Sequence, residues 1–152
     1  MGEEERCAVE AIRRTIHSYN IAGDSRNAAL YVPLWAEDAS IEFPGFGPVP
    51  GFACQGASEI AKRTEAWNPD PAIDPGFAKT KFIRHNLTTS LITLTGPDTA
   101  RARTYFIVMT EIGQDHCGTY DDELVCRDGK WLFQHRRIAL DWRAEGSLFP
   151  PL

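Results

Sequence analysis

Apolar residues near the start of the chain recur at steps of three and four positions, which is the spacing of one buried helical stripe. Charged residues occupy the other faces of the same segment. The pattern predicts an amphipathic helix over residues 3–22, and Gly23 suits the left-handed conformation that commonly ends a helix. The buried stripe consists of Ala8, Ile12, Ile16 and Tyr19.

Two more helices and a short strand are predicted before the middle of the chain. A second helix covers about 27–35, and Pro33 must kink it or lie near one of its ends. Residues 40–43 alternate like a short strand, and the proline- and glycine-rich run after them indicates a loop. A third helix runs from residue 56 to about 67, and three prolines predict irregular structure over 68–76.

From residue 81 onward the pattern has a period of two, which is typical of strands with one buried face. Strands are predicted at 81–94, 99–112, 117–127 and 130–142. Turn residues separate them at Gly96-Pro97-Asp98, Gly113-Gln114-Asp115 and Asp128-Gly129. Because strands of this length twist strongly, we expect an α+β fold in which a curved antiparallel sheet, with three helices on its concave face, encloses a cavity. One domain is predicted over 3–143, followed by a C-terminal tail over 144–152.

Composition and charge argue against two classes of binding partner, nucleic acids and membranes. The chain has 152 residues, of which 43% are hydrophobic, and this suffices for one sizeable core. Its net charge is −5 and it has no basic tract, so we expect no nucleic-acid partner. No apolar run approaches the roughly 20 residues of a membrane span, and the acidic start differs from a signal peptide. We therefore predict a cytoplasmic protein without membrane contact, in which the cysteines are free thiols.

Three stretches of the sequence carry a resemblance to a known family. They are Ile16–Ala39 (IHSYNIAGDSRNAALYVPLWAEDA), Arg84–Leu87 (RHNL), and a stretch from Gly118-Thr119-Tyr120 through Arg127–Trp131 to Arg136-Arg137. Together they resemble the SnoaL-like branch of the nuclear-transport-factor-2-like superfamily, over residues 5–143. The resemblance implies a cone-shaped, cystatin-like fold and an activity that needs no cofactor.

The resemblance also implies a set of catalytic residues. Bile-acid dehydratase, scytalone dehydratase and hexachlorocyclohexane dehydrochlorinase belong to this branch and use an Asp–His pair to abstract a proton during an elimination. In the bile-acid dehydratase pattern a Tyr precedes the Asp by five residues and the His lies on the first long strand, and Tyr19, Asp24 and His85 match these positions. The dehydrochlorinase pattern adds an Arg five residues after a Trp of the last strand, which Arg136 matches. The additional Tyr and the second His of scytalone dehydratase have no counterpart identified in the sequence.

The chemistry of these residue types supports the implied roles, although each residue also has a structural alternative. A neutral His85 suits a base that works near pH 7, and Asp24 would fix its tautomer. Alternatively, His85 is a core histidine, Asp24 caps the second helix, and Tyr19 belongs to the core. Arg136 and Arg137 point to opposite faces of a strand, and the sequence does not decide which one enters the cavity.

Aromatic and apolar residues are candidates for a substrate pocket and its lid. They are Phe43, Phe46, Phe52, Trp67, Leu87, Tyr105 and Tyr120. His116 is placed in the turn after Asp115, where the spacing of nearby residues favours no metal site. The outer face of the sheet is a candidate contact surface for a homodimer or homotrimer. Its candidate residues are Arg101, Arg103, Tyr105, His135 and Arg137.

These observations predict an enzyme rather than a structural protein. The favoured function is a cofactor-independent lyase, of the dehydratase or elimination type, that acts on a hydrophobic small molecule by His–Asp acid–base chemistry. A polyketide cyclase or a ketosteroid-type isomerase is an alternative, because both begin with proton abstraction beside a carbonyl. A non-catalytic small-molecule-binding or assembly module is a second alternative, since the superfamily also contains transport factors and assembly subunits.

Overall fold

The computed structural model describes residues 2–67 and 80–149, and its helices come first. The long helix α1 (Glu3–Asp24) is followed by the short helix α2 (Ala28–Tyr31) and the 3-10 turn η1 (Val32–Leu34). Strands β1 (Trp35–Phe43) and β2 (Phe52–Gln55) precede α3 (Ala57–Lys62) and the 3-10 turn η2 (Arg63–Ala66). The second half consists of β3 (Arg84–Leu94), β4 (Thr99–Thr110), β5 (Gly113–Arg127) and β6 (Lys130–Arg143).

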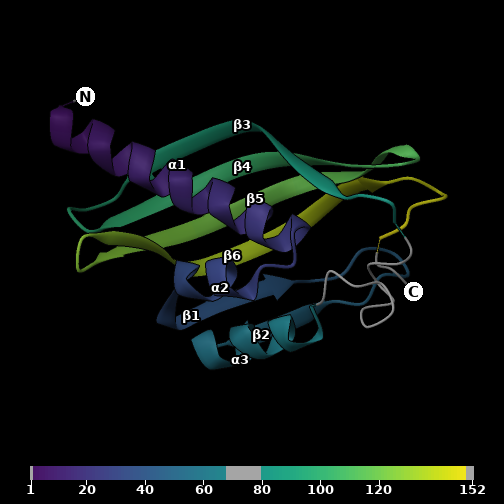
Figure 1. Ribbon diagram of the computed structural model, residues 1–152. Coiled ribbons are helices and arrows are strands. Elements are labelled where there is room, and N and C mark those ends of the chain that lie inside the picture. The colour runs from purple at the N-terminus through teal and green to yellow at the C-terminus, as the bar shows by residue number, and fades with distance from the viewer. Residues whose placement is uncertain (1, 68–79, 150–152) are drawn as a thin grey trace.

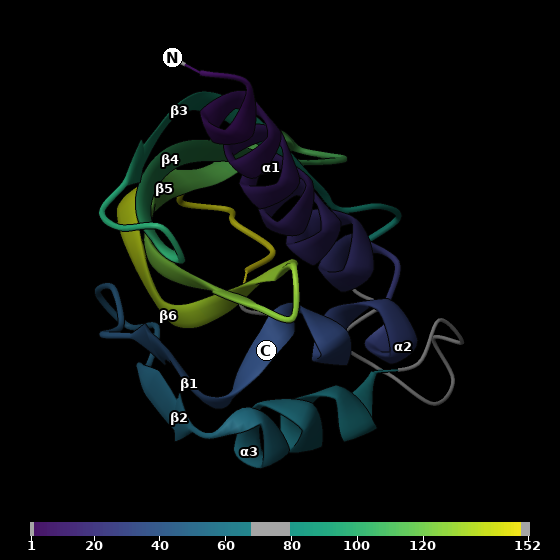
Figure 2. The same ribbon diagram turned by 90° about the vertical axis from the view of Figure 1, so that its left-hand side faces the viewer.

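The described strands form one six-stranded sheet in the order β2-β1-β6-β5-β4-β3. β1 runs parallel to β6, and the other neighbouring strands are antiparallel. The sheet curves strongly, and α1 lies across its concave side, while α2 and α3 lie near β1 (Figures 1 and 2). The predicted α+β architecture of a curved sheet with three helices is confirmed, and the parallel β1–β6 pair departs from the predicted antiparallel pairing.

The apolar stripe of α1 is buried against the sheet. Ile12 and Ile16 are fully buried in a core that also contains Phe133 of β6. Burying an aliphatic or aromatic side chain of this size stabilises the fold by about 1.5–3 kcal/mol. The Thr15 hydroxyl donates a hydrogen bond of 2.7 Å to the Trp131 carbonyl oxygen and ties the helix to β6. The predicted amphipathic helix is confirmed, and its buried stripe fixes the position of α1 relative to the sheet.

The first helix ends later than the sequence indicates. Gly23 stays inside α1, so the prediction that it ends the helix is wrong, and Arg26 adopts the left-handed conformation instead, with φ 53°. The second helix is capped by Asn27, whose side chain accepts a hydrogen bond of 3.0 Å from the Leu30 N–H. Asp24 therefore has no capping role in α2, and its carboxylate is available to β3.

Several other boundaries differ from the sequence-based prediction. β1 already begins at Trp35, and β2 escapes prediction because its four residues follow a proline-rich loop without clear alternation. The predicted second helix ends at Tyr31, because Pro33 lies in η1. The turn predicted at 113–115 is wrong, since the chain turns at 111–112 and β5 begins at Gly113. The irregular segment predicted over 68–76 lies outside the described residues.

The predicted C-terminal tail is described as far as Phe149, and it packs back against the sheet. The amide N–H of Ala144 donates a hydrogen bond of 2.8 Å to the Asp115 carbonyl oxygen.

All four cysteines are free thiols, in agreement with their spacing in the sequence. Across residues 2–67 and 80–149, no helix has both the length and the apolar character that a bilayer span requires.

Candidate active site

A cavity of about 340 Å³ lies between α1 and the concave side of the sheet. This volume suits a small organic molecule. Its lining is mainly aromatic and aliphatic. The apolar and aromatic part includes Tyr19, Tyr31, Phe43, Phe52, Trp67, Tyr120, Ile138, Leu140 and Phe149. The acidic and basic side chains of the described lining are Asp24, Arg26, Arg63, His85 and His116.

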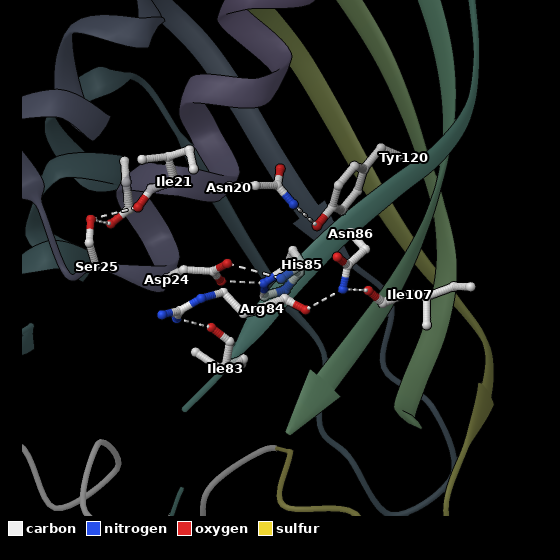
Figure 3. A network of polar contacts seen from close by, with 11 residues as sticks. Asn20, Ile21, Asp24, Ser25, Ile83, Arg84, His85, Asn86, Ile107 and Tyr120 are labelled. Carbon is white, nitrogen blue, oxygen red and sulfur yellow. Dashed lines mark hydrogen bonds and ion pairs between the residues drawn. The ribbon is translucent and has the colours of Figure 1, made fainter. Parts of the chain in front are cut away.

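Asp24 and His85 meet at this cavity, Asp24 from the end of α1 and His85 from the start of β3. The Asp24 Oδ1 lies 2.6 Å from the His85 Nδ1, and the His85 backbone N–H donates to the Asp24 Oδ2 at 2.9 Å (Figure 3). The Asp24 side chain is 9% exposed and the His85 side chain 22%. The carboxylate is thus shielded from water while the ring reaches the cavity. Because Nδ1 is bonded to the carboxylate, Nε2 is the nitrogen left to accept a proton.

A second His–Asp pair lies beside the first, in the place where the sequence indicated a turn. The His116 Nδ1 lies 2.7 Å from the Asp115 Oδ1, and both side chains are almost fully buried. The ring centroids of His116 and His85 are 6.3 Å apart. Burial lowers the pKa of His116, although its hydrogen bond with Asp115 acts in the opposite direction, so the ring is neutral at pH 7. Sequence analysis missed this cavity residue because a bulge in β5 makes Asp115 an extra residue and interrupts the period of two.

The C-terminal tail closes the cavity beside His116. The Phe149 ring stacks on the His116 ring, with centroids 4.4 Å apart. The Ser147 hydroxyl donates to the Asp115 Oδ1 at 2.6 Å, and the Leu148 N–H donates to the Asp115 Oδ2 at 2.8 Å. Burial by itself would raise the pKa of Asp115, but the bonds from Ser147, His116 and Leu148 lower it. Asp115 therefore stays ionised and holds both the imidazole and the tail.

Three tyrosines form a cluster in the cavity wall. The Tyr19 ring centroid lies 5.2 Å from that of Tyr31 and 5.9 Å from that of Tyr120. The Asn20 side chain donates a long hydrogen bond of 3.5 Å to the Tyr120 hydroxyl. Burial raises the pKa of Tyr31 and Tyr120 above the usual value, and the neighbouring Tyr19 raises both further. These phenols stay protonated and are able to donate hydrogen bonds to an oxygen or leaving group in the cavity.

Arg136 points toward the tyrosine cluster, while Arg137 points to the outer face. The Arg136 guanidinium is fully buried, donates twice to the Asp122 carboxylate at 2.7 Å, and lies 4.1 Å from the ring centroids of Tyr19 and Tyr120. Arg137 lies 3.2 Å from Glu42 on the other face. Arg136 is absent from the described cavity lining. Its charge is paired with Asp122 and it packs against the tyrosine rings, and its catalytic role stays a prediction.

The predicted pocket residues divide into two groups. Phe43, Phe52, Trp67 and Tyr120 line the cavity, and their role in substrate binding stays a prediction. Phe46, Leu87 and Tyr105 do not belong to the described lining. Tyr105 is 48% exposed on the outer face, because strand alternation places its neighbours Thr104 and Phe106 inside. Leu87 packs between the two core clusters, and Phe46 pairs with Val49 in the loop after β1.

The outer face of the sheet carries cross-strand ion pairs. Arg101 lies 3.2 Å from Glu123, and Arg103 bonds both oxygens of Asp121 at 2.6 and 3.0 Å. His135 is bonded to the Ser40 hydroxyl at 2.7 Å. The use of this face in a homo-oligomer stays a prediction.

Among residues 2–67 and 80–149, no three His, Cys, Asp or Glu side chains are arranged as a metal site would require.

A family model described as a SnoaL-like domain matches residues 4–137, which is most of the chain. No curated protein shows significant sequence similarity to the chain.

Solved structures with the same fold are numerous, and three illustrate their range. A candidate scytalone dehydratase from Novosphingobium aromaticivorans superposes with a TM-score of 0.74 at 19% identity, over 95% of this chain and 91% of that one. A hexachlorocyclohexane dehydrochlorinase, LinA-type3, from Novosphingobium barchaimii has a TM-score of 0.69 at 16% identity, over 93% and 91%. An NTF2-like protein with a cystatin-like fold from Novosphingobium aromaticivorans has a TM-score of 0.68 at 24% identity, over 93% and 85%. At these identities the likeness shows the fold.

Proposed function

The chain belongs to the SnoaL-like domain family, and we propose that it is a cofactor-independent lyase that removes a proton from a hydrophobic small molecule, with His85 as the base. The observation that carries the proposal is the 2.6 Å contact between the Asp24 carboxylate and the His85 Nδ1 at the wall of an apolar cavity. The dehydratase and dehydrochlorinase among the structural neighbours support an elimination on the same fold.

The Asp24–His85 pair supplies the proton-abstraction step. Hydrogen bonding to Asp24 holds the proton on Nδ1, which leaves the lone pair of Nε2 free to take a proton from a carbon of the substrate. The imidazolium formed is stabilised by the same carboxylate. The second bond, from the His85 backbone N–H to the Asp24 Oδ2, holds the carboxylate in place beside the ring. The base is therefore oriented before the substrate arrives.

The tyrosine cluster supplies hydrogen-bond donors for the charge that develops on the substrate. Tyr19 lies in the cavity lining beside Tyr31 and Tyr120, and the two buried phenols are protonated. In an elimination the C–H electrons form the new double bond, the bond to the leaving group breaks, and the departing group takes a proton or a hydrogen bond from a tyrosine or from the imidazolium of His85. Because the lining is apolar, each of these contacts is stronger than in water.

His116 is suited to binding rather than to donating a proton. Its Nδ1 is committed to Asp115 and its ring is neutral at pH 7, so Nε2 is an acceptor. It would accept a hydrogen bond from a substrate hydroxyl close to His85, since the two rings are 6.3 Å apart. If this hydroxyl is the leaving group, the proton that lets it depart as water has to come from a tyrosine or from the imidazolium of His85.

An isomerase or a cyclase is the second candidate function, because it would share the abstraction step. A ketosteroid-type mechanism would use a carboxylate base in the cavity, but the Asp24 carboxylate is engaged by His85. A non-catalytic module would be favoured by an exposed Asp24, whereas its side chain is 9% exposed. The geometry therefore supports a histidine base more strongly than a carboxylate base or a non-catalytic module, and the screen below separates elimination from isomerisation and cyclisation.

A deuterium-exchange screen tests the proposal before the product is known. Steroids, polyketide-like aromatics and halogenated alicyclic compounds are incubated with the protein in deuterated buffer and followed by mass spectrometry and NMR. We expect exchange or elimination with at least one class, and loss of the signal in the His85→Asn variant. The proposal fails if every class remains unchanged, or if His85→Asn is as active as the wild type.

A further inference from the structure

The cavity has an uneven distribution of charge. Its described lining contains one carboxylate, that of Asp24, and this group is bonded to His85. Two arginines, Arg26 and Arg63, lie in the same lining. His85 lies on β3, at one edge of the sheet, whereas the Arg63 guanidinium lies over the ring of Phe52 in β2, at the other edge. The cavity thus has a His–Asp side and a cationic side.

Arg63 differs from the arginines of the sheet's outer face. Arg101, Arg103 and Arg137 each form an ion pair with a carboxylate, whereas no carboxylate in the described ranges is paired with Arg63. The Glu59 carboxylate, one turn earlier, is turned away and accepts a hydrogen bond of 2.8 Å from the Gln55 N–H. The positive charge of Arg63 therefore lacks a counter-charge from the described part of the protein.

The guanidinium of the exposed Arg63 lies over an aromatic ring. Its central carbon lies 3.6 Å from the ring centroid of Phe52, which also lines the cavity. A guanidinium held over a ring is restricted in position, and its N–H groups can still bind a carboxylate with two hydrogen bonds. Arg26 adds positive charge on the same side, with its guanidinium carbon 5.7 Å from the Trp67 ring.

We propose that Arg63 is the recognition site for an anionic oxygen group, a carboxylate or its equivalent, on the apolar molecule that occupies the cavity. The substrate class is then an aromatic or alicyclic acid, with its ring system among the aromatic side chains and its reacting carbon next to His85. This inference rests on the proposed function only in taking the cavity as the substrate site. It requires no particular reaction.

Matched acid and ester probes test the proposal by binding alone. The probes are the carboxylic acids of naphthalene, anthracene and pyrene and their methyl esters, with affinities measured by fluorescence and calorimetry. We expect the wild-type protein to prefer an acid to its ester by about tenfold, as one charge-assisted pair at a partly exposed site provides. Arg63→Gln should abolish the preference by weakening acid binding without changing ester binding. Lys62→Gln, which removes a neighbouring charge outside the described lining, should leave both affinities unchanged.

The outcomes separate this inference from the proposed function. His85→Asn should lose proton exchange and keep the preference for the acid. If no exchange is found with any compound but Arg63→Gln still abolishes the acid preference, the anion site stands and the proposed reaction falls. The anion site is overturned if the wild type shows no preference for any acid, including the case in which no probe binds, or if Arg63→Gln and Lys62→Gln behave alike.

Discussion

The Asp24 carboxylate forms two hydrogen bonds with His85, one with the ring Nδ1 at 2.6 Å and one with the backbone N–H at 2.9 Å. One side chain therefore sets the orientation of the imidazole and also joins the end of α1 to the start of β3. Since β3 is an edge strand, this contact helps to hold the strand that carries the base. Substitutions at Asp24 can separate the two effects.

Asp24→Asn should remove activity while it preserves the fold. The amide oxygen can still accept from the His85 N–H, but the amide N–H₂ faces Nδ1, which moves the ring proton to Nε2 and blocks the base. We expect proton exchange to fall by about 10²- to 10⁴-fold, with a thermal midpoint close to that of the wild type. Asp24→Ala removes both acceptors and should also lower the free energy of unfolding by about 1–3 kcal/mol. Exchange rates and denaturation curves measure the two effects, and an active Asp24→Asn protein would contradict the assigned tautomer.

Tyr19→Phe should reduce turnover without a comparable loss of substrate affinity. The substitution keeps the ring that lies 4.1 Å from the Arg136 guanidinium and removes the hydroxyl from the cavity. A donor that acts on charge in the transition state is expected to lower kcat by at least about tenfold when removed. Tyr105→Phe on the outer face is the matched control and should have no effect. Steady-state kinetics with the substrate found by exchange gives kcat and KM for both variants. Equal kcat values for the two variants would assign Tyr19 to the core alone.

The sequence predicts those parts of the molecule whose pattern is local. The buried stripe of α1 and the Asp128-Gly129 turn follow from spacing and turn chemistry, and the resemblance brings Asp24 and His85 into register before any contact is known. The roles of Asp24 and His85 are still proposals. Their 2.6 Å contact is a property of the fold.

The parts that sequence analysis misses depend on distant contacts. His116 enters the cavity because β5 pairs with β4 through a bulge, and a Gly-Gln-Asp run that looks like a turn hides this pairing. Arg136 faces inward as the resemblance implies, but its partner Asp122 belongs to a different strand, and no spacing within β6 reveals that its charge is already bound. Arg63 likewise becomes a cavity residue only when the fold places η2 beside the cavity.

Asp121 and Asp122 offer a matched comparison of an exposed and a buried ion pair. Asp122 binds the fully buried Arg136, whereas its neighbour Asp121 binds Arg103 on the surface. Asp122→Ala leaves a buried charge without its partner and should lower the free energy of unfolding by about 3–5 kcal/mol. Asp121→Ala should cost less than about 1 kcal/mol. Urea denaturation measures both values, and similar losses for the two variants would show that Arg136 finds another partner or solvent.

The buried His116 should make stability depend on pH below neutrality. Its pKa is lowered in the folded protein, mainly by burial, so the unfolded chain binds a proton at a higher pH than the folded chain does. Above about pH 7.5 the ring is neutral in both states and contributes no pH dependence. As the pH falls further, protonation favours the unfolded state, and stability decreases by up to about 1.4 kcal/mol per pH unit until the folded ring titrates. The lowered pKa of Asp115 affects stability in a different pH range. The ionised carboxylate stabilises the folded protein at higher pH, and this stabilisation is lost only below about pH 4.

Two histidine variants isolate this contribution. His116→Asn keeps a side chain that can donate to Asp115 but cannot take up the proton, so its stability should fall less than that of the wild type between about pH 7 and pH 5. His17→Asn replaces an exposed histidine on α1 and should retain the wild-type slope. Urea denaturation at several pH values gives the slopes directly. If the wild type and His116→Asn lose stability in parallel, protonation of His116 does not contribute to stability in this pH range. The lowered pKa assigned to the buried ring would then be contradicted.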